Sequence, residues 1–91
     1  MTVAEERIDR LQQLARTAAA DDEHDRAREY VRLARRIAER NRLELPRSFT
    51  RATCDRCDAY LRPGDNARVR LRDGHVVITC SCGHHSRYPY E

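Results

Sequence analysis

Cys54-Asp55-Arg56-Cys57 and Cys80-Ser81-Cys82 are two cysteine pairs separated by 22 residues. Zinc binds four thiolate or imidazole donors in a tetrahedron, and two pairs carried on turns supply such a set. The C-terminal segment that contains them has few aliphatic residues, and segments this small rarely fold without a metal, disulfides or a partner. We therefore predict a zinc ribbon in which one structural Zn2+ is bound by Cys54, Cys57, Cys80 and Cys82.

The second cysteine pair leaves the fourth ligand open. One residue separates Cys80 from Cys82, whereas two is the usual spacing in such sites. His84 and His85 follow directly, so either histidine is an alternative to Cys82 or Cys80. Two disulfides and a redox-active Cys-x2-Cys pair are the other interpretations of the four cysteines. The redox interpretation lacks the βαβ pattern that it needs, and four thiolates leave zinc no open position for catalysis.

The cellular location bears on the chemistry of the cysteines. Residues 1–6 lack the basic and apolar regions of a signal peptide. No apolar run reaches the ~20 residues that are needed to span a bilayer. We therefore expect a cytoplasmic protein with no membrane contact. Thiols stay reduced in the cytoplasm, which favours metal ligation over disulfides.

A β-hairpin is predicted between the two cysteine pairs. Residues 67–72 alternate with period two, Asp73-Gly74 is typical of a two-residue hairpin turn, and residues 75–79 form the return strand. A third short strand is expected over residues 86–88, which completes a three-stranded antiparallel sheet. Arg68, Arg70 and Arg72 share one face of it. The turn sets a register on the other face that pairs Leu71 with Val76, Val69 with Ile78, and Ala67 with Cys80.

Two amphipathic helices are predicted before the ribbon. Thr2 and Glu5 fit a capping box at the start of the first helix, over residues 3–20. An aspartate within residues 21–23 is expected to cap a second helix over residues 22–42, which makes an antiparallel helical hairpin. Since two helices alone seldom bury both of their apolar stripes, we expect a partner protein to cover part of them. The stripe of the second helix consists of Ala27, Tyr30, Val31, Ala34, Ile37 and Ala38.

The charge of the chain is unevenly distributed. Residues 1–25 contain three arginines and seven acidic residues, whereas residues 26–91 contain fifteen arginines and eight acidic residues. The basic part favours a polyanionic partner. Every cation is an arginine, which binds phosphate in bidentate fashion and stacks on bases. A GC-rich genome or adaptation to salt is the alternative cause of the missing lysines, and a solvated helix face is the alternative interpretation of the clustering.

We predict RNA binding by arginines of the second helix, the connector and the ribbon. Tyr88 and Tyr90 either stack on bases or pack on the ribbon. Pro46 ends the second helix, so the chain divides into a helical hairpin (1–42), a basic connector (43–53) and a zinc ribbon (54–91), which is a small α+β fold. The predicted RNA-binding residues are Arg28, Arg32, Arg35, Arg36, Arg40, Arg42, Arg47, Arg51, Arg68, Arg70 and Arg87.

Several segments together are similar to a known family. They are Ala34-Arg35-Arg36-Ile37-Ala38, Leu45-Pro46, Arg51, Pro63-Gly64-Asp65-Asn66-Ala67-Arg68-Val69-Arg70-Leu71, Val76-Val77-Ile78-Thr79-Cys80 and Arg87-Tyr88-Pro89-Tyr90. Over nearly its whole length the chain resembles the zinc-ribbon protein subunit of archaeal and eukaryotic ribonuclease P, which is protein component four in archaea.

The resemblance implies a ribonucleoprotein endonuclease that removes the 5′ leader of precursor tRNA. It implies that the ribonuclease P RNA holds the catalytic centre, and that this chain binds and stabilises that RNA without a catalytic residue of its own. It also implies a heterodimer, through the helices, with an Sm-like barrel protein of the same enzyme. The alternatives are a zinc-ribbon transcription or translation factor that docks on protein or DNA, and a redox or metal-handling protein. The segment 63–71 and the Arg-Tyr-Pro-Tyr ending argue against the first of these.

Overall fold

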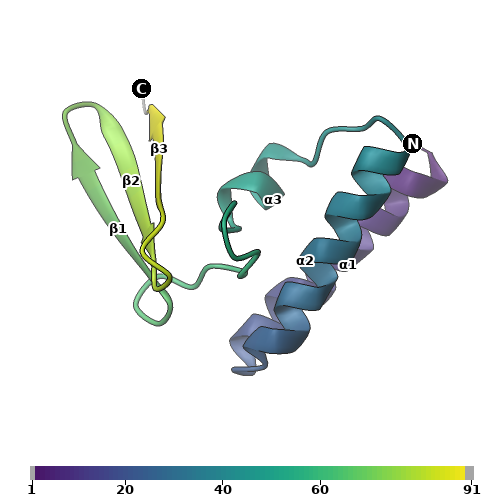
Figure 1. Cartoon of the computed structure of the whole chain (residues 1–91), viewed down its shortest axis with the longest axis horizontal. Coiled ribbons are helices and arrows are strands. Elements are labelled where there is room, and N and C mark those ends of the chain that lie inside the picture. Colours follow the sequence, from purple (N-terminus) through teal and green to yellow (C-terminus); the bar gives the residue numbers. More distant parts are fainter. Residues whose placement is uncertain (1, 90–91) are drawn as a thin grey trace.

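Two antiparallel helices build the N-terminal half of the chain. In the computed structural model, which describes residues 2–89, α1 spans Val3–Ala20 and α2 spans His24–Arg40. A short helix, α3 (Arg47–Arg51), follows, and then three strands, β1 (Ala67–Arg72), β2 (His75–Cys80) and β3 (His85–Pro89). Figure 1 shows the sheet on one side of α3 and the helical hairpin on the other. The predicted small α+β fold is confirmed. Within residues 2–89, no helix is long and apolar enough to cross a lipid bilayer.

Helix α1 is capped at both ends by its own sequence. Thr2 Oγ1 accepts a hydrogen bond from the Glu5 N–H (3.2 Å), and Glu5 Oε1 accepts one from the Thr2 N–H (3.0 Å), so the predicted capping box is present. At the other end Asp22 takes a left-handed conformation (φ 61°), and the Glu23 N–H donates to the Ala18 carbonyl at 2.8 Å. This Schellman arrangement ends the helix.

The prediction that an aspartate caps α2 is wrong. The N-cap residue is Glu23, and its side chain makes no capping hydrogen bond. Asp22 is committed to the left-handed turn that ends α1, a conformation that short polar side chains tolerate. Helix α2 therefore begins at His24 rather than at residue 22. It also ends earlier than predicted, at Arg40, because Arg42 adopts a second left-handed turn (φ 54°).

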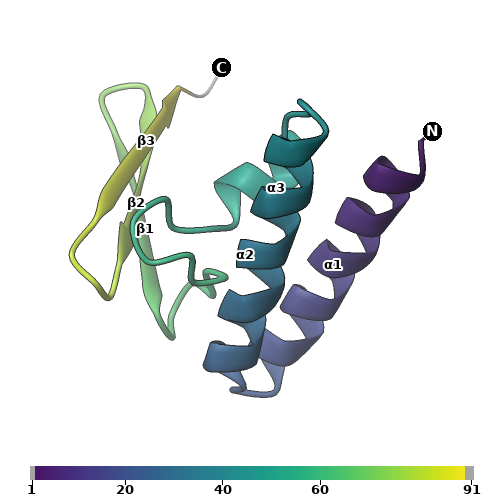
Figure 2. The same ribbon diagram turned by 45° about the vertical axis from the view of Figure 1, so that its right-hand side comes forward.

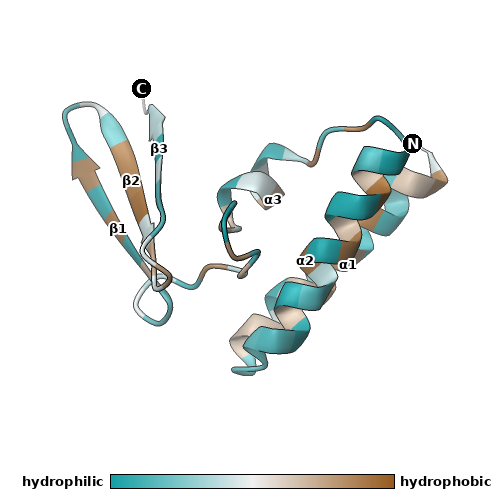
Figure 3. Ribbon diagram, viewed as in Figure 1, coloured by the Kyte–Doolittle hydropathy of each residue, from teal (hydrophilic) through white to brown (hydrophobic). Residues whose placement is uncertain are grey.

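The two helices bury their apolar stripes against each other. Ala15 and Ala19 of α1 and Ala27 and Ala34 of α2 have no exposed surface. Small residues at a helix contact reduce the distance between the helix axes, and α1 and α2 lie side by side along their whole length (Figure 2). Hydrophobic residues are found where α1 meets α2 and along β2 (Figure 3).

The connector contributes to this core, which the sequence analysis did not predict. Pro46 precedes α3, and its carbonyl accepts hydrogen bonds from the N–H groups of residues 49 and 50 at 2.9 Å each. The short helix places Phe49 in the hairpin core with no exposed surface, in the same buried cluster as Tyr60. The chain itself thus covers much of the stripe for which a partner was expected. The large apolar side chains that stay exposed on the described hairpin are Val3 and Leu33.

The sheet has the predicted register. Its order is β1-β2-β3, and Ala67 pairs with Cys80, Val69 with Ile78, and Leu71 with Val76. Asp73 (φ 48°) and Gly74 (φ 78°) both adopt the left-handed conformation that a type I′ turn requires. Strand β3 exceeds the predicted third strand by one residue at each end. One face of the sheet carries arginines, and the other is apolar with exposed Val69 and Leu71.

Candidate metal centre and nucleic-acid interface

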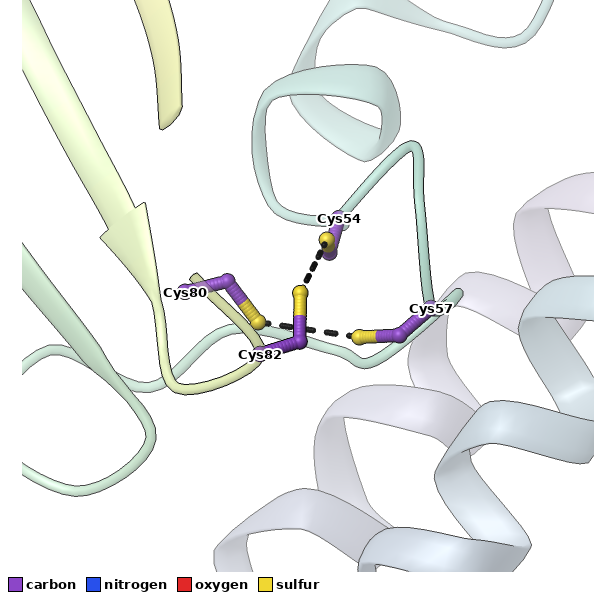
Figure 4. A group of neighbouring side chains, drawn as sticks. All are labelled: Cys54, Cys57, Cys80 and Cys82. Carbon is purple, nitrogen blue, oxygen red and sulfur yellow. Dashed lines mark hydrogen bonds between the residues drawn. The ribbon is translucent and has the colours of Figure 1, made fainter. Parts of the chain in front are cut away.

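Four cysteines come together between the connector and the sheet. Cys54 and Cys57 lie in the loop after α3, and Cys80 and Cys82 lie at and just beyond the end of β2 (Figure 4). Cys54 Sγ is 3.6 Å from Cys82 Sγ, and Cys57 Sγ is 3.6 Å from Cys80 Sγ. All four sulfur atoms lie within 4.8 Å of one another, and none forms a disulfide.

The donor set fits a tetrahedral metal ion. Sulfur atoms bound to zinc at about 2.3 Å lie about 3.8 Å apart at tetrahedral angles, which is close to the 3.6 Å between the paired sulfurs. The short spacing of the second pair is accommodated because Cys80 ends a strand and Cys82 lies in the turn that follows. Gly83 (φ 97°) closes that turn, and its N–H donates to the Cys80 carbonyl. The four cysteines are therefore able to hold a metal ion.

Burial controls the acidity of the thiols in the metal-free chain. Cys54 is 1% exposed, and desolvation raises its pKa to about 12, against the opposing effect of the backbone N–H groups of Cys57 and Arg56. Burial also raises the pKa of Cys80. A hydrogen bond from the His84 N–H lowers the pKa of the exposed Cys82 to about 7. A bound cation offsets the cost of burying thiolates, since a coordinating thiol is deprotonated.

Neither histidine after the second pair joins the cysteine cluster. His85 Nδ1 forms a hydrogen bond of 2.9 Å with Thr79 Oγ1 on the sheet. His84 contributes its backbone N–H to Cys82. The group of candidate ligands within 4.8 Å of one another contains the four cysteines and no histidine. The geometry thus favours four cysteine ligands over the alternatives with His84 or His85.

Three of the candidate RNA-binding arginines contact the first cysteine pair of their own chain or the residue directly after it. Arg28 Nε donates a hydrogen bond to the Cys57 carbonyl (2.9 Å), and Arg35 Nη2 donates one to the Cys54 carbonyl (3.3 Å). Arg32 Nε donates to the carboxylate of residue 58, directly after the pair (3.1 Å). These side chains join α2 to the cysteine loop.

The remaining candidate arginines of α2 and the connector lie elsewhere. Arg36 and Arg40 line a groove where the start of α1 meets the end of α2, and the groove also contains Arg7, Val3, Leu33 and Ile37. Arg42 and Arg47 are exposed after α2 and at the start of α3. Within residues 2–89, none of these four candidates pairs with a carboxylate. The structure therefore divides the predicted arginines among several surfaces.

The arginines of the ribbon gather on one face of the sheet. Arg68, Arg70 and Arg87 line a single groove, together with Arg72 and His85. We call it the arginine groove. The register places Arg70 and Arg87 on either side of Val77. All of these arginines are exposed, and in the described part of the chain none has a carboxylate partner. The alternation of residues 67–72 predicted this face correctly.

Arg51 has an aromatic partner within the chain. Its guanidinium lies over the ring of Tyr88, 4.9 Å from the ring centroid. Tyr88 pairs with Val76 and therefore lies on the apolar face of the sheet, opposite to the arginine groove. The ring is thus engaged in packing rather than presented beside Arg87. Tyr90, the other tyrosine considered for stacking, lies outside the described residues.

Sequence reasoning missed two arginines that join the helices to the loop before β1. Arg62 Nη1 donates to the carbonyls of Ala19 (3.1 Å) and Ala20 (3.3 Å) at the end of α1. Arg16 Nε donates to the Tyr60 hydroxyl (3.3 Å). The available signal was that α1 has no basic residue in its last turn, although helix C-termini favour cations. That signal indicates the need for a cation without revealing which arginine supplies it.

The comparison with known families agrees with this architecture. The model of the RNAse P Rpr2/Rpp21/SNM1 subunit domain matches residues 7–83. The chain belongs to this family. It is a protein subunit of ribonuclease P, the enzyme that the sequence resemblance indicated. The match does not favour the alternative of a transcription or translation factor.

Relatives and solved structures match this member of the Rpr2/Rpp21/SNM1 family along most of its length. It is 70% identical over 89 residues to the ribonuclease P protein component 4 of Halobacterium salinarum, a match that covers 98% of this chain and 96% of that protein. The component 4 of Methanopyrus kandleri is 52% identical over 92 residues, covering 97% of this chain and 71% of the relative. A chain in the cryo-EM structure of archaeal ribonuclease P with mature tRNA matches with a TM-score of 0.91 at 46% identity, over 97% of this chain and 77% of that one. The Pfu Rpp21 structure matches with a TM-score of 0.67 at 43% identity, over 93% of this chain and 97% of that one.

Proposed function

We propose that this ribonuclease P subunit binds the RNA of the enzyme through the arginine groove of its sheet. The observation that carries the proposal is the placement of Arg70 and Arg87 on either side of Val77, with Arg68 on the same face. None of the three has a carboxylate partner among residues 2–89. The matched archaeal structure contains ribonuclease P together with mature tRNA, which supports an RNA partner for this chain as well.

The arginine groove suits a phosphate backbone rather than base edges. Guanidinium groups bind phosphate oxygens in bidentate fashion. Side chains two residues apart on a strand repeat about every 6.7 Å, so Arg68 and Arg70 present successive positive charges along β1. Val77 and Thr79 also line the groove and carry no aromatic ring, and the His85 ring in the groove is hydrogen-bonded to Thr79 Oγ1. Contacts of this kind fix the position of an RNA without reading its sequence.

We propose that the catalytic centre lies outside this chain, in the RNA of the enzyme, with precursor tRNA as the substrate whose 5′ leader is removed in the cytoplasm. Four cysteine ligands saturate a tetrahedral ion and leave no position for a reacting water. Among residues 2–89, the other group of possible ligands is Asp22, His24 and Asp65, and it lies beside the Arg62 guanidinium, which is 3.7 Å from Asp22 and 3.9 Å from Asp65. That guanidinium already offsets part of the negative charge of the two carboxylates.

We also propose that the ion held by Cys54, Cys57, Cys80 and Cys82 is a single structural Zn2+. The support is a donor set of four thiols, which is typical of structural zinc. Zinc supplies a closed cross-link between the connector and the sheet, and its binding free energy adds to the free energy of folding. The first pair belongs to the loop after α3 and the second to the end of β2, so the ion would hold the arginine groove in place relative to the helices.

The helical hairpin is proposed to bind the Sm-like barrel protein of the same enzyme. The groove between the start of α1 and the end of α2 combines the exposed Val3 and Leu33 with Arg36 and Arg40. An apolar centre with a charged rim is typical of protein interfaces, and the arginines favour an acidic surface on the partner. In this proposal the hairpin (1–42) faces protein, the ribbon (54–91) faces RNA, and the connector (43–53) joins them.

The test of RNA binding is the salt dependence of affinity for ribonuclease P RNA. Arg70→Gln and Arg87→Gln are compared with Arg10→Gln, which removes an exposed arginine from α1. We expect each groove variant to weaken binding and to reduce the salt slope by roughly one, while the control leaves both unchanged. Groove variants that bind like Arg10→Gln would exclude this face as the RNA contact.

A further inference from the structure

Side chains of helix α2 form hydrogen bonds with the backbone of the first cysteine pair. Arg28 and Arg35 of α2 donate hydrogen bonds to the carbonyls of Cys57 (2.9 Å) and Cys54 (3.3 Å), the two cysteines of the pair. Arg35 Nη2 also donates to the hydroxyl of the fully buried Thr53 (3.1 Å). Arg28 and Arg35 are seven residues apart and so lie on one side of α2. The backbone of both cysteines of the first pair is thus hydrogen-bonded to α2.

Asp58, in the loop directly after the first cysteine pair, pairs with arginines of α2. It has a left-handed conformation (φ 62°), and its N–H donates to the Cys54 carbonyl at 2.9 Å, which closes the turn between the two cysteines. Its carboxylate accepts a hydrogen bond from Arg32 Nε (3.1 Å) and forms an ion pair with Arg35 Nε (3.2 Å). The Asp58 side chain is 23% exposed, and partly buried pairs are screened less by salt than surface pairs.

The second cysteine pair is supported differently. The Cys80 N–H donates to the His84 carbonyl, and the Ser81 N–H donates to the Asn66 carbonyl, both at 2.9 Å. These are backbone contacts within the ribbon. In the part of the chain that the structure describes, no arginine side chain donates a hydrogen bond to this pair. The two halves of the candidate metal site therefore depend on different parts of the fold.

We propose that Arg28 and Arg35, together with Asp58, are positioning residues of the metal site. They hold the first cysteine pair in its metal-binding conformation before the ion arrives, and so make metal affinity depend on α2. A ligand pair that is already ordered loses less conformational entropy on binding. Groups that orient metal ligands typically change metal affinity by about 10- to 100-fold when they are removed. The inference rests on the proposed zinc site.

An RNA contact is the competing role for Arg28 and Arg35. Their side chains are 31% and 30% exposed. Arg28 Nε and Arg35 Nη2 donate to the loop, and Arg35 Nε, which forms no hydrogen bond within residues 2–89, lies in an ion pair with the Asp58 carboxylate. A phosphate would have to displace these contacts. Arg36 follows Arg35 directly, is exposed, and makes no contact with the cysteine loop among the hydrogen bonds of residues 2–89. It therefore serves as a control of equal charge.

The test is competition for Zn2+ between the full chain and a chelator of known affinity. We expect Arg35→Met and Arg28→Met to lower zinc affinity by roughly 10- to 100-fold, and Arg36→Met to change it by less than about twofold. Circular dichroism of each metal-loaded variant reports whether the helices are retained. If Arg35→Met loses helix content, the zinc affinity of Asp58→Asn is used instead. This variant keeps all arginines, and asparagine tolerates a positive φ.

Hydrogen exchange of the metal-free chain gives a readout that does not involve zinc. The Asp58 N–H should be protected in the wild type and in Arg36→Met, and should exchange faster in Arg35→Met. Zinc affinities of Arg35→Met and Asp58→Asn equal to that of Arg36→Met would overturn the proposal. A wild-type chain that takes up no zinc would instead reject the zinc assignment itself. If Arg35→Met binds zinc normally but binds ribonuclease P RNA more weakly, the proposal is overturned and Arg35 is instead an RNA contact.

Discussion

The Arg51 guanidinium lies over the ring of Tyr88, 4.9 Å from its centroid, and this contact joins α3 to β3. It links the helical part to the sheet in addition to the cysteine cluster. An exposed cation–π contact contributes about 0.5–1 kcal/mol, so we expect Tyr88→Leu and Arg51→Gln to share a coupling free energy of that size. Urea unfolding of the two single variants and the double variant measures it. Strictly additive effects would show that the contact does not stabilise the chain.

Phe49 should be the most sensitive apolar position of the connector. Its side chain has no exposed surface and packs in the core of the hairpin. Truncation of a buried phenylalanine costs about 3–5 kcal/mol, so Phe49→Ala should largely unfold the hairpin in thermal or urea denaturation. Leu33→Ala is the control, since Leu33 is 42% exposed and its truncation should cost well under 1 kcal/mol. Equal losses in the two variants would contradict the observed core.

Arg62 should stabilise the end of α1. Its Nη1 donates to the Ala19 and Ala20 carbonyls at the end of the helix, where carbonyls lack intrahelical partners; the Ala19 carbonyl also accepts from the Asp22 N–H. We expect Arg62→Gln to lower the free energy of unfolding by about 1 kcal/mol. Arg26→Gln provides the comparison, because among residues 2–89 Arg26 makes only an i,i+3 pair with Glu23, worth a few tenths of a kcal/mol. A stability change in Arg62→Gln no larger than in Arg26→Gln would argue against the capping role.

Removal of the metal should make stability sensitive to alkaline pH. Burial raises the pKa of Cys54 to about 12 in the metal-free chain, above the ordinary thiol value of 9.0. The stability from the neutral thiol is therefore fully present below pH 9 and is lost as pH rises toward 12. Tyrosines also ionise in this pH range. Cys54→Ser removes the thiol and keeps every tyrosine, so its free energy of unfolding should decrease less between pH 9 and 12. A metal-free wild type with the same pH profile as Cys54→Ser would contradict this assignment.

Acid, rather than alkali, should weaken metal binding by the chain. Metal binding requires deprotonated thiols, so protons compete with the ion and affinity falls as pH decreases. Chelator competition at a series of pH values measures this effect. The expected result is proton release on metal uptake, and an affinity that is independent of pH would argue against thiolate ligands.

Local sequence patterns predicted the elements whose interactions are close along the chain. The alternation of residues 67–72 and the Asp73-Gly74 turn determine the sheet register by themselves, because a shift by one residue would invert both faces. Thr2 and Glu5 likewise determine the start of α1. These features need no knowledge of tertiary structure.

Long-range contacts account for what the sequence did not reveal. An arginine on the polar side of α2 looks the same in the sequence whether it faces water, RNA or the cysteine loop, and Arg28 and Arg35 face the loop. Phe49 occurs in a basic connector with no periodicity, and only the packing of α3 shows that it is buried. An aspartate within residues 21–23 was expected to cap α2, but Asp22 adopts the left-handed conformation that ends α1, and Glu23 occupies the N-cap position.

The most direct test of the central claim is recovery of RNA with the tagged chain from the organism that encodes it, followed by sequencing. We predict that ribonuclease P RNA is enriched with the wild type, and that the enrichment is lost with the Arg70→Gln/Arg87→Gln double variant but kept with Arg10→Gln. Recovery of no ribonuclease P RNA with the wild-type chain would contradict RNA binding by this subunit.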